Sequence, residues 1–153
     1  MSADAEHAGW PFQWTVSVRS LQAQARVGVY APERQAAQAI VLDAELHCAA
    51  ATFPQRLSQV LDYDAFCALV ADHLGREQHT DLLETLAAEL LCRAYSSFPQ
   101  LVQARLSLCK PAAAGKAASV RVQLALSRRQ CALLQQHQPL AAPTRQAELA
   151  TDR

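Results

Sequence analysis

The sequence predicts an α+β domain with element order ββααββ, in which a four-stranded antiparallel sheet carries two helices on one face. Two observations lead to this fold class. Four segments alternate apolar and polar residues with a period of two, as half-buried strands do. Between the second and third of them, two segments repeat apolar residues at helical spacing. The 153 residues suit one domain, and 51% of them are hydrophobic, which is enough for a sizeable core.

The first two predicted strands lie in the N-terminal third of the chain. Residues 14–18 alternate cleanly, and the alternation continues less cleanly as far as Tyr30. The segment 30–38 reads as a connection in which Pro32 fixes a turn. Residues 40–48 alternate again, and the short connection predicts that this strand pairs antiparallel with the first.

The two predicted helices follow a loop. Residues 62–76 place apolar side chains at helical spacing, and Gly75 supplies a stop. A second helix is expected over residues 81–96, with its apolar residues on one face and Phe98–Pro99 at its end.

Two further strands, residues 102–109 and 120–126, complete the sheet, and a turn-rich link over residues 110–115 joins them. Because all four strands alternate, one face of the sheet can carry the helices while the other stays polar. A polar face with exposed edges favours edge-to-edge pairing of several copies into a closed barrel. We therefore expect an oligomer.

The two ends of the chain differ from its middle. Residues 1–12 are small and polar and are expected to form a flexible arm, residues 13–129 the domain, and the Gln-, Ala- and Pro-rich residues 130–153 a disordered tail. The N-terminus does not resemble a secretory signal, and no run approaches the roughly 18 apolar residues of a membrane span. A cytoplasmic location is the expectation.

Composition argues against several classes of function. The 14 basic residues equal the 14 acidic ones, so no global field attracts nucleic acid or an anionic membrane. The five cysteines are odd in number and contain no CxxC pair, which indicates buried, reduced thiols rather than disulfides or a zinc site. The histidines form no HxH or HxxxH pair, and no nucleotide-binding loop is present. We expect neither a metal nor a cofactor.

Four polar residues stand at the ends of predicted elements, where functional sites tend to lie. Each has an ordinary structural explanation when taken alone. Glu33 could be a solvated loop acid, and Tyr63 could pack at the start of a helix. Glu84 completes a D-x-x-E capping box with Asp81, and Lys110 could be a solvated residue at a strand end.

The sequence around these four residues favours a functional role over the structural explanations. The blocks VGVYAPERQAAQ (27–38), VLDYDAF (60–66), LLETLAAEL (82–90) and LSLCKP (106–111) resemble the four signature blocks of dihydroneopterin aldolases, in order and spacing. The resemblance covers about residues 14–128. It implies the tunnelling fold, in which the sheets of several subunits, here a tetramer or octamer, combine into a barrel with active sites between neighbours.

The resemblance also implies a role for each matched residue. Glu84 would anchor the pterin by accepting hydrogen bonds from its 2-amino group and N3. Tyr63 would approach from a neighbouring subunit and bind near the ring and the side-chain hydroxyls. The wall of the pocket would be formed by Leu61, Leu83 and the backbone near Val29 and Tyr30.

Lys110 and Glu33 would then flank the reacting side chain. Retro-aldol cleavage of 7,8-dihydroneopterin removes a proton from the 2′-hydroxyl and moves electrons into the ring, whose own imine is the electron sink. No Schiff base and no metal is required for this step. Lys110 is the candidate acid/base residue, acting through ordered water, and Glu33 would orient the hydrogen-bond network.

Two alternatives remain open. The first is a dihydroneopterin or dihydroneopterin triphosphate 2′-epimerase, which shares the retro-aldol step and then re-adds the aldehyde. The second is a non-catalytic paralogue that binds a pterin or purine, although retention of both Glu33 and Lys110 argues against it.

The chain also lacks the acidic segment that the family usually carries before the tyrosine block, since residues 52–59 contain no carboxylate. This difference bears on substrate preference.

Overall fold

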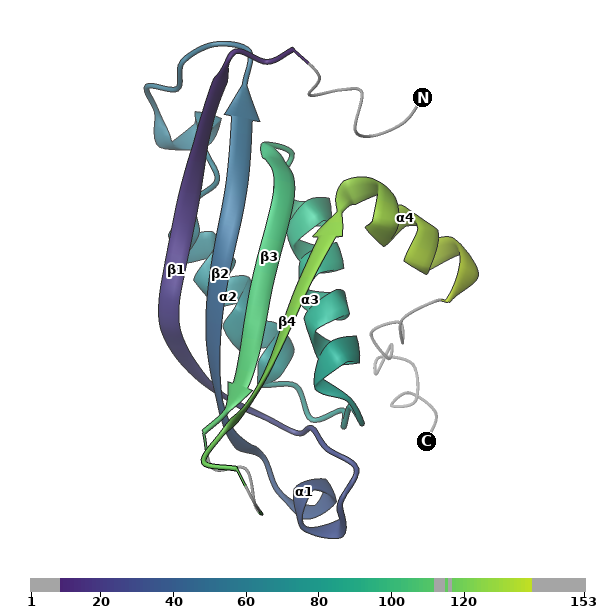
Figure 1. The fold of residues 1–153 in the computed structure, drawn as a ribbon. Helices are drawn as coiled ribbons and strands as arrows, with labels where there is room; N and C mark the ends of the chain where they lie inside the picture. Colours follow the sequence, from purple (N-terminus) through teal and green to yellow (C-terminus); the bar gives the residue numbers. More distant parts are fainter. Residues whose placement is uncertain (1–8, 112–114, 116, 139–153) are drawn as a thin grey trace, which may run out of the picture.

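The computed structural model describes residues 9–111, 115 and 117–138, and it confirms the predicted order of two strands, two helices and two strands (Figure 1). The sheet is antiparallel throughout, with its strands in chain order. Its strands are β1 (Phe12–Ala25), β2 (Gln38–Ala50), β3 (Leu101–Lys110) and β4 (Val120–Ser127). Helices α2 (Tyr63–Leu74) and α3 (Leu83–Ser97) both lie on one face of it (Figure 1).

The two faces of the sheet differ as the alternation predicts. On β2, every second residue from Ile40 to Cys48 is buried at 1% exposure or less, and these side chains join the core under the helices. The other face carries charged pairs, including Arg19 with Glu45 at 3.2 Å and Arg121 with Asp43 at 2.6 Å. The helices therefore cover an apolar layer, and the opposite face stays polar.

A bulge in β1 explains why its alternation weakens after residue 18. Val18 pairs with Ala44, whereas the next paired residue, Leu21, faces Leu42. Ser20 lies in the bulge with φ of 56°, and its N–H donates to Asp43 Oδ1 at 2.8 Å. The extra residue moves the inward-facing positions from even to odd numbers, which a strict period of two cannot represent.

The two central helices begin in different ways. Asp62 caps α2, since its carboxylate accepts from the N–H groups of Asp64 and Ala65 at 2.9 and 3.4 Å. The N-cap of α3 is Leu82, and no side chain caps it. The structural alternative for Glu84, a capping box with Asp81, is therefore not found at this helix start. The carboxylate of Asp81 instead binds Arg34 at 2.9 Å.

Two short helices lie outside the predicted pattern. Helix α1 (Ala31–Gln35) occupies the segment expected to be only a turn, with Pro32 at its start, where proline fits well. Helix α4 (Arg128–His137) covers the beginning of the expected disordered tail, so that expectation is wrong for residues 130–137. Residues 139–153 lie outside the described part. A 3-10 turn, η2 (Leu57–Gln59), precedes α2.

Polar contacts explain why α4 forms in a Gln-rich segment. Ser127 and Gln130 make a reciprocal capping box at its start. Cys131 is buried against the core. The guanidinium of Arg128 donates to three carbonyl groups at the corner between α3 and β3, those of Tyr95, Phe98 and Leu101.

The N-terminal boundary and the cysteines can also be compared with expectation. Strand β1 begins at Phe12, inside the expected arm, and Phe12 pairs with Ala50. Residues 1–8 are outside the described ranges.

All five cysteines are free, and all but the half-buried Cys67 are buried, as expected for small apolar side chains. Burial raises the pKa of Cys48 to about 11, so its thiol stays protonated at neutral pH. None of the described helices has the length and apolar character needed to cross a membrane.

Candidate functional site

Glu33 and Lys110 meet at one end of the sheet, although 77 positions separate them in the sequence. Strand β1 ends there, β2 begins there, and β3 ends there with Lys110. The Nζ atom of Lys110 lies 2.7 Å from Oε1 of Glu33. Their side chains are only 14% and 21% exposed, so this ion pair is partly shielded from water.

The Glu33 carboxylate is held at both oxygens. Oε1 accepts from Lys110 and, at 3.4 Å, from Nε2 of Gln38. Oε2 accepts from the N–H of Tyr30 at 3.1 Å. Because the Lys110 ammonium donates to it most strongly, the pKa of Glu33 is lowered from its ordinary value of 4.5. Glu33 is therefore a fixed carboxylate at neutral pH.

Gly28 provides the space in which this carboxylate lies. Its φ is 131°, a region that residues with a Cβ rarely adopt. A Cβ at this position would overlap the carboxylate of Glu33. The bare backbone of Gly28 and the position of Glu33 thus depend on each other.

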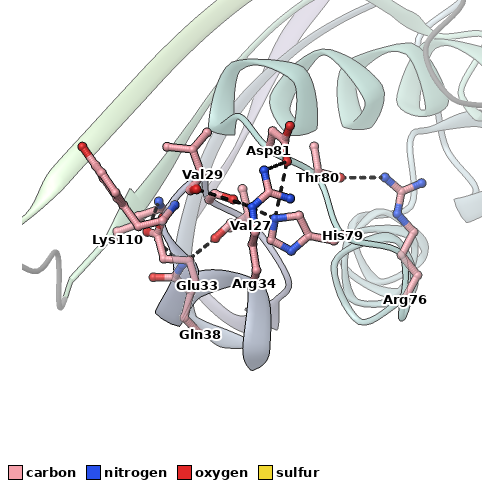
Figure 2. A network of polar contacts seen from close by, with 12 residues as sticks. Val27, Val29, Glu33, Arg34, Gln38, Arg76, His79, Thr80, Asp81 and Lys110 are labelled. Carbon is pink, nitrogen blue, oxygen red and sulfur yellow. Dashed lines mark hydrogen bonds and ion pairs between the residues drawn. The ribbon is translucent and has the colours of Figure 1, made fainter.

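The segment around Gly28, residues 27–30, is held by side chains from three parts of the chain (Figure 2). Three successive carbonyl groups each accept a hydrogen bond from a different side chain. The donors are Gln38 to Val27 at 2.6 Å, His79 to Gly28 at 2.7 Å and Arg34 to Val29 at 3.4 Å. These polar contacts fix the backbone that leads into Glu33.

Sequence reasoning missed these three donors. Gln38 and Arg34 lie inside the block that carries the family resemblance, so the block contains a signal for both. His79 lies in the connection between α2 and α3, 51 positions from its backbone partner, and no pattern in the sequence marks it.

The beginning of α3 belongs to the same end of the molecule. A parallel bridge joins Val27 to Thr80, two residues before the N-cap Leu82. Glu84 lies in the first turn of α3 and is exposed, and Leu83 beside it is buried. The structure therefore presents the carboxylate of Glu84 to solvent rather than to its own helix.

Three apolar side chains at this end are unusually exposed. Val29 is 48% exposed, Tyr30 72% and Leu82 49%. They lie on the two segments that the bridge between Val27 and Thr80 brings together. Grouped apolar exposure beside charged residues is typical of a surface that contacts a ligand or another protein.

Tyr63 begins α2, at the opposite end of that helix from the connection that contacts Gly28, and Leu61 lies two residues before it. The chain reaches them from the loop after Ala50, whose strand partner is Phe12 (Figure 1). Tyr63 is 59% exposed at the start of α2, whereas Leu61 is 2% exposed and belongs to the core. Within one chain, the structure does not bring Tyr63 to Lys110.

The side chains at this end of the sheet can bind a polar ligand and exchange protons with it. A fixed carboxylate, an ammonium group and an exposed second carboxylate, that of Glu84, supply acceptors and donors for a polar ring and its side chain. In the described ranges, no three His, Cys, Asp or Glu side chains gather into a potential metal site.

Known structures share the fold of this chain. The chain is similar to a putative dihydroneopterin aldolase from Vibrio cholerae, with 28% identity and a TM-score of 0.67 over 75% of this chain and 98% of that one. It also has the fold of Escherichia coli dihydroneopterin aldolase in complex with neopterin, with 24% identity, a TM-score of 0.64 and coverage of 74% and 99%.

A dihydroneopterin aldolase from Burkholderia thailandensis bound to guanine has the same fold, with 20% identity, a TM-score of 0.60 and coverage of 80% and 97%. A search of curated protein sequences gives no match. The profile of the family described as "FolB: Dihydroneopterin aldolase" matches residues 16–125. That range contains all four candidate residues, and the chain belongs to the FolB, or dihydroneopterin aldolase, family.

Proposed function

We propose that this protein cleaves 7,8-dihydroneopterin into 6-hydroxymethyl-7,8-dihydropterin and glycolaldehyde, a retro-aldol reaction of folate biosynthesis. The observation that carries the proposal is the partly shielded contact of 2.7 Å between Lys110 and Glu33. It lies at the same end of the sheet as the exposed Glu84. An ammonium group beside a fixed carboxylate is suited to proton exchange with a hydroxylated side chain.

The reaction balances with groups of this chain and water alone. The 2′-hydroxyl loses its proton, the C1′–C2′ bond breaks, and C2′ leaves as the aldehyde carbon of glycolaldehyde. The electron pair moves into the imine of the ring, and C1′ then takes up a proton. Lys110 would exchange these protons through ordered water, and Glu33 would hold Lys110 and the hydroxyl groups in place.

Glu84 is the proposed anchor of the ring. A carboxylate can accept two parallel hydrogen bonds from neighbouring N–H groups. The ligands named for two of the similar structures, neopterin and guanine, share a 2-amino-4-oxopyrimidine ring that offers such a pair. The exposure of the carboxylate on the first turn of α3 supports this use. Leu83 and the backbone near Val29 and Tyr30 would line the ring.

The remaining part of each site would come from a second copy. Tyr63 begins α2, far along that helix from the connection that contacts Gly28, so a site that contains both Tyr63 and Lys110 would be shared between two subunits. We propose a homo-oligomer, a tetramer or octamer closed through the strand edges, in which Tyr63 and the backbone near Leu61 face Lys110 of a neighbour. No cofactor is part of this proposal.

Product analysis tests the activity. The purified protein is incubated with 7,8-dihydroneopterin, and the products are separated by chromatography. Glycolaldehyde with hydroxymethyldihydropterin, and without the C2′ epimer 7,8-dihydromonapterin, is the expected result. Accumulation of 7,8-dihydromonapterin would instead make the protein an epimerase, and tight neopterin binding without turnover would make it a binding protein.

Two single variants test the division of roles. Lys110→Ala is expected to bind neopterin within about twofold of the wild type and to lose at least about a hundredfold in turnover, because general acid–base catalysis contributes on that scale. Glu84→Ala is expected to lose neopterin binding itself. Binding is measured by the quenching of pterin fluorescence. Unchanged turnover of Lys110→Ala would remove Lys110 from the mechanism.

A further inference from the structure

We infer that His79 is a positioning residue that holds the Glu33–Lys110 pair in place through the backbone of Gly28. The inference rests on the proposed function for its kinetic readout. Its structural readout does not depend on that function. His79 touches neither Glu33 nor Lys110 in the contacts described above, so any effect on the pair must pass through the segment 27–30.

The contact between His79 and Gly28 is direct and short. The imidazole Nε2 lies 2.7 Å from the carbonyl oxygen of Gly28, which can only accept, so Nε2 carries the proton. The Nδ1 atom is buried and has no hydrogen-bond partner among the described residues. The side chain is 21% exposed. The same Nε2 also lies 3.7 Å from Oδ1 of the exposed Asp81, which is beyond hydrogen-bond distance, so the Gly28 carbonyl is the closest partner of the ring.

The residue after His79 holds the other side of the same glycine. The N–H of Gly28 donates to the carbonyl of Thr80 at 3.1 Å, and the N–H of Thr80 donates to the carbonyl of Arg26 at 3.0 Å. Arg76 donates to Thr80 Oγ1 at 3.4 Å and forms an ion pair with the buried Glu89 of α3. The donor and acceptor of Gly28 are thus both fixed by a connection that is itself attached to α3.

The position of Gly28 is transmitted to the site by close packing. The carboxylate of Glu33 occupies the space that a Cβ of Gly28 would fill. A shift of the Gly28 peptide therefore moves or releases this carboxylate, and with it the atom that lies 2.7 Å from Lys110. Small displacements of such groups are costly because catalytic geometry tolerates less than about 1 Å.

His79 is a suitable place to test this connection, because its only hydrogen bond among the described residues is the one to Gly28 and its contact with Asp81 is longer, at 3.7 Å. Gln38 and Arg34 hold the neighbouring carbonyls, but Gln38 binds Glu33 directly and Arg34 also pairs with Asp81. Truncation of either would disturb several contacts. A glutamine at position 79 can place its amide nitrogen near the site of Nε2, whereas a leucine keeps most of the volume and has no donor.

The test compares His79→Leu with His79→Gln. The leucine variant is expected to lose about tenfold or more in kcat on 7,8-dihydroneopterin, with the Kd for neopterin unchanged within about twofold. The glutamine variant is expected to recover most of the loss. His137→Ala, a change on the exposed surface of α4, is the control and should behave as the wild type. If the leucine variant does not fold, His79→Ala removes the same donor with less bulk.

Crystal structures of the two variants supply a readout that needs no turnover. The Lys110–Glu33 contact should stay near 2.7 Å in His79→Gln and open beyond hydrogen-bond distance in the leucine or alanine variant. A wild type without aldolase turnover would defeat the proposed function and leave this comparison intact. An unchanged contact in the variant without a donor, or a glutamine variant as impaired as that one, would overturn the inference.

Discussion

Gly28 and Glu33 share one small volume, and this makes single substitutions unusually informative. Gly28→Ala adds a methyl group where the carboxylate of Glu33 lies, at a φ of 131°. Strain of this kind costs about 1–3 kcal/mol, and the displaced carboxylate should also reduce turnover by at least about tenfold. Thermal unfolding and the aldolase assay measure the two effects.

Gly115 is the matched control for that change. Its φ is 126°, close to that of Gly28, but a Cβ there would meet no atom of the described residues within 4 Å. Gly115→Ala should therefore show the backbone strain without loss of turnover. Equal turnover in the two variants would mean that Glu33 does not depend on the bare backbone of Gly28.

The ion pair also gives the stability of the protein a defined pH dependence. The pKa of Glu33 is lowered in the folded state, chiefly by Lys110, so the unfolded chain binds more protons near its ordinary value of 4.5. This contribution is fully present above pH 4.5 and is lost as the pH falls through the lowered pKa. Lys110→Met should therefore be less stable than the wild type at pH 7, and the difference should shrink toward pH 3.

Denaturant unfolding at matched protein concentration measures that difference, since an oligomer's stability depends on concentration. Asp43 also has a lowered pKa, because the N–H of Ser20 and the side chain of Arg121 donate to it. It contributes equally to both proteins and cancels in the comparison. A difference that stays constant from pH 7 to pH 3 would contradict the assigned partner of Glu33.

At the scale of elements, the attachment of α4 is the least expected feature. Arg128 donates at 2.7, 3.1 and 2.8 Å to three carbonyls, and its guanidinium also lies 5.1 Å from the centre of the Tyr95 ring. Arg128→Met leaves these acceptors without their donor. We expect a loss of about 2–4 kcal/mol in the free energy of unfolding, measured with urea.

Arg129 provides the control at the next position. It is exposed at the start of the same helix, so Arg129→Met removes an equal charge with little structural loss. The expected change is within about 0.5 kcal/mol. If both variants lost the same stability, net charge rather than the three hydrogen bonds would hold the helix.

The same element shows how far sequence reasoning reaches. Periodicity gave the strands and central helices, because burial against one sheet face imposes it. It could not give α4, whose stability comes from a capping box and from Arg128 contacting residues some 30 positions earlier. Asp81 failed as a cap for a similar reason, since its partner Arg34 is 47 positions away.

The residues of the candidate site also differ in how far the sequence could predict them. Glu33 and Lys110 could be proposed because each belongs to a recognisable block, and the structure brings them together at 2.7 Å. His79 could not, since it binds a backbone carbonyl that any residue would offer. The bulge at Ser20 likewise depends on a side chain of the neighbouring strand, that of Asp43.

At the scale of the whole molecule, the proposed site would take Tyr63 from one chain and Lys110 from a neighbouring chain. Tyr63→Ala and Lys110→Ala should each be inactive as homo-oligomers. When the two are mixed under denaturing conditions and refolded, a site with Tyr63 from one chain and Lys110 from the other contains both residues. About one quarter of sites in an equal random mixture should do so, because each half is drawn independently.

The turnover of the refolded mixture measures this complementation. Each variant refolded alone is the control, and both should stay inactive. A mixture no more active than either parent, despite confirmed hybrid oligomers, would show that one chain supplies both residues.

The three hydrogen bonds of Arg128 can form only late in the synthesis of the protein. The carbonyls that it binds are synthesised 27 to 33 residues before it. At a translation rate of roughly 5–20 residues per second, the emerging chain holds α3 and the start of β3 for seconds before their donor exists. The corner between them is therefore completed only when the ribosome has passed β4, so the middle of the protein is finished by a residue near its end.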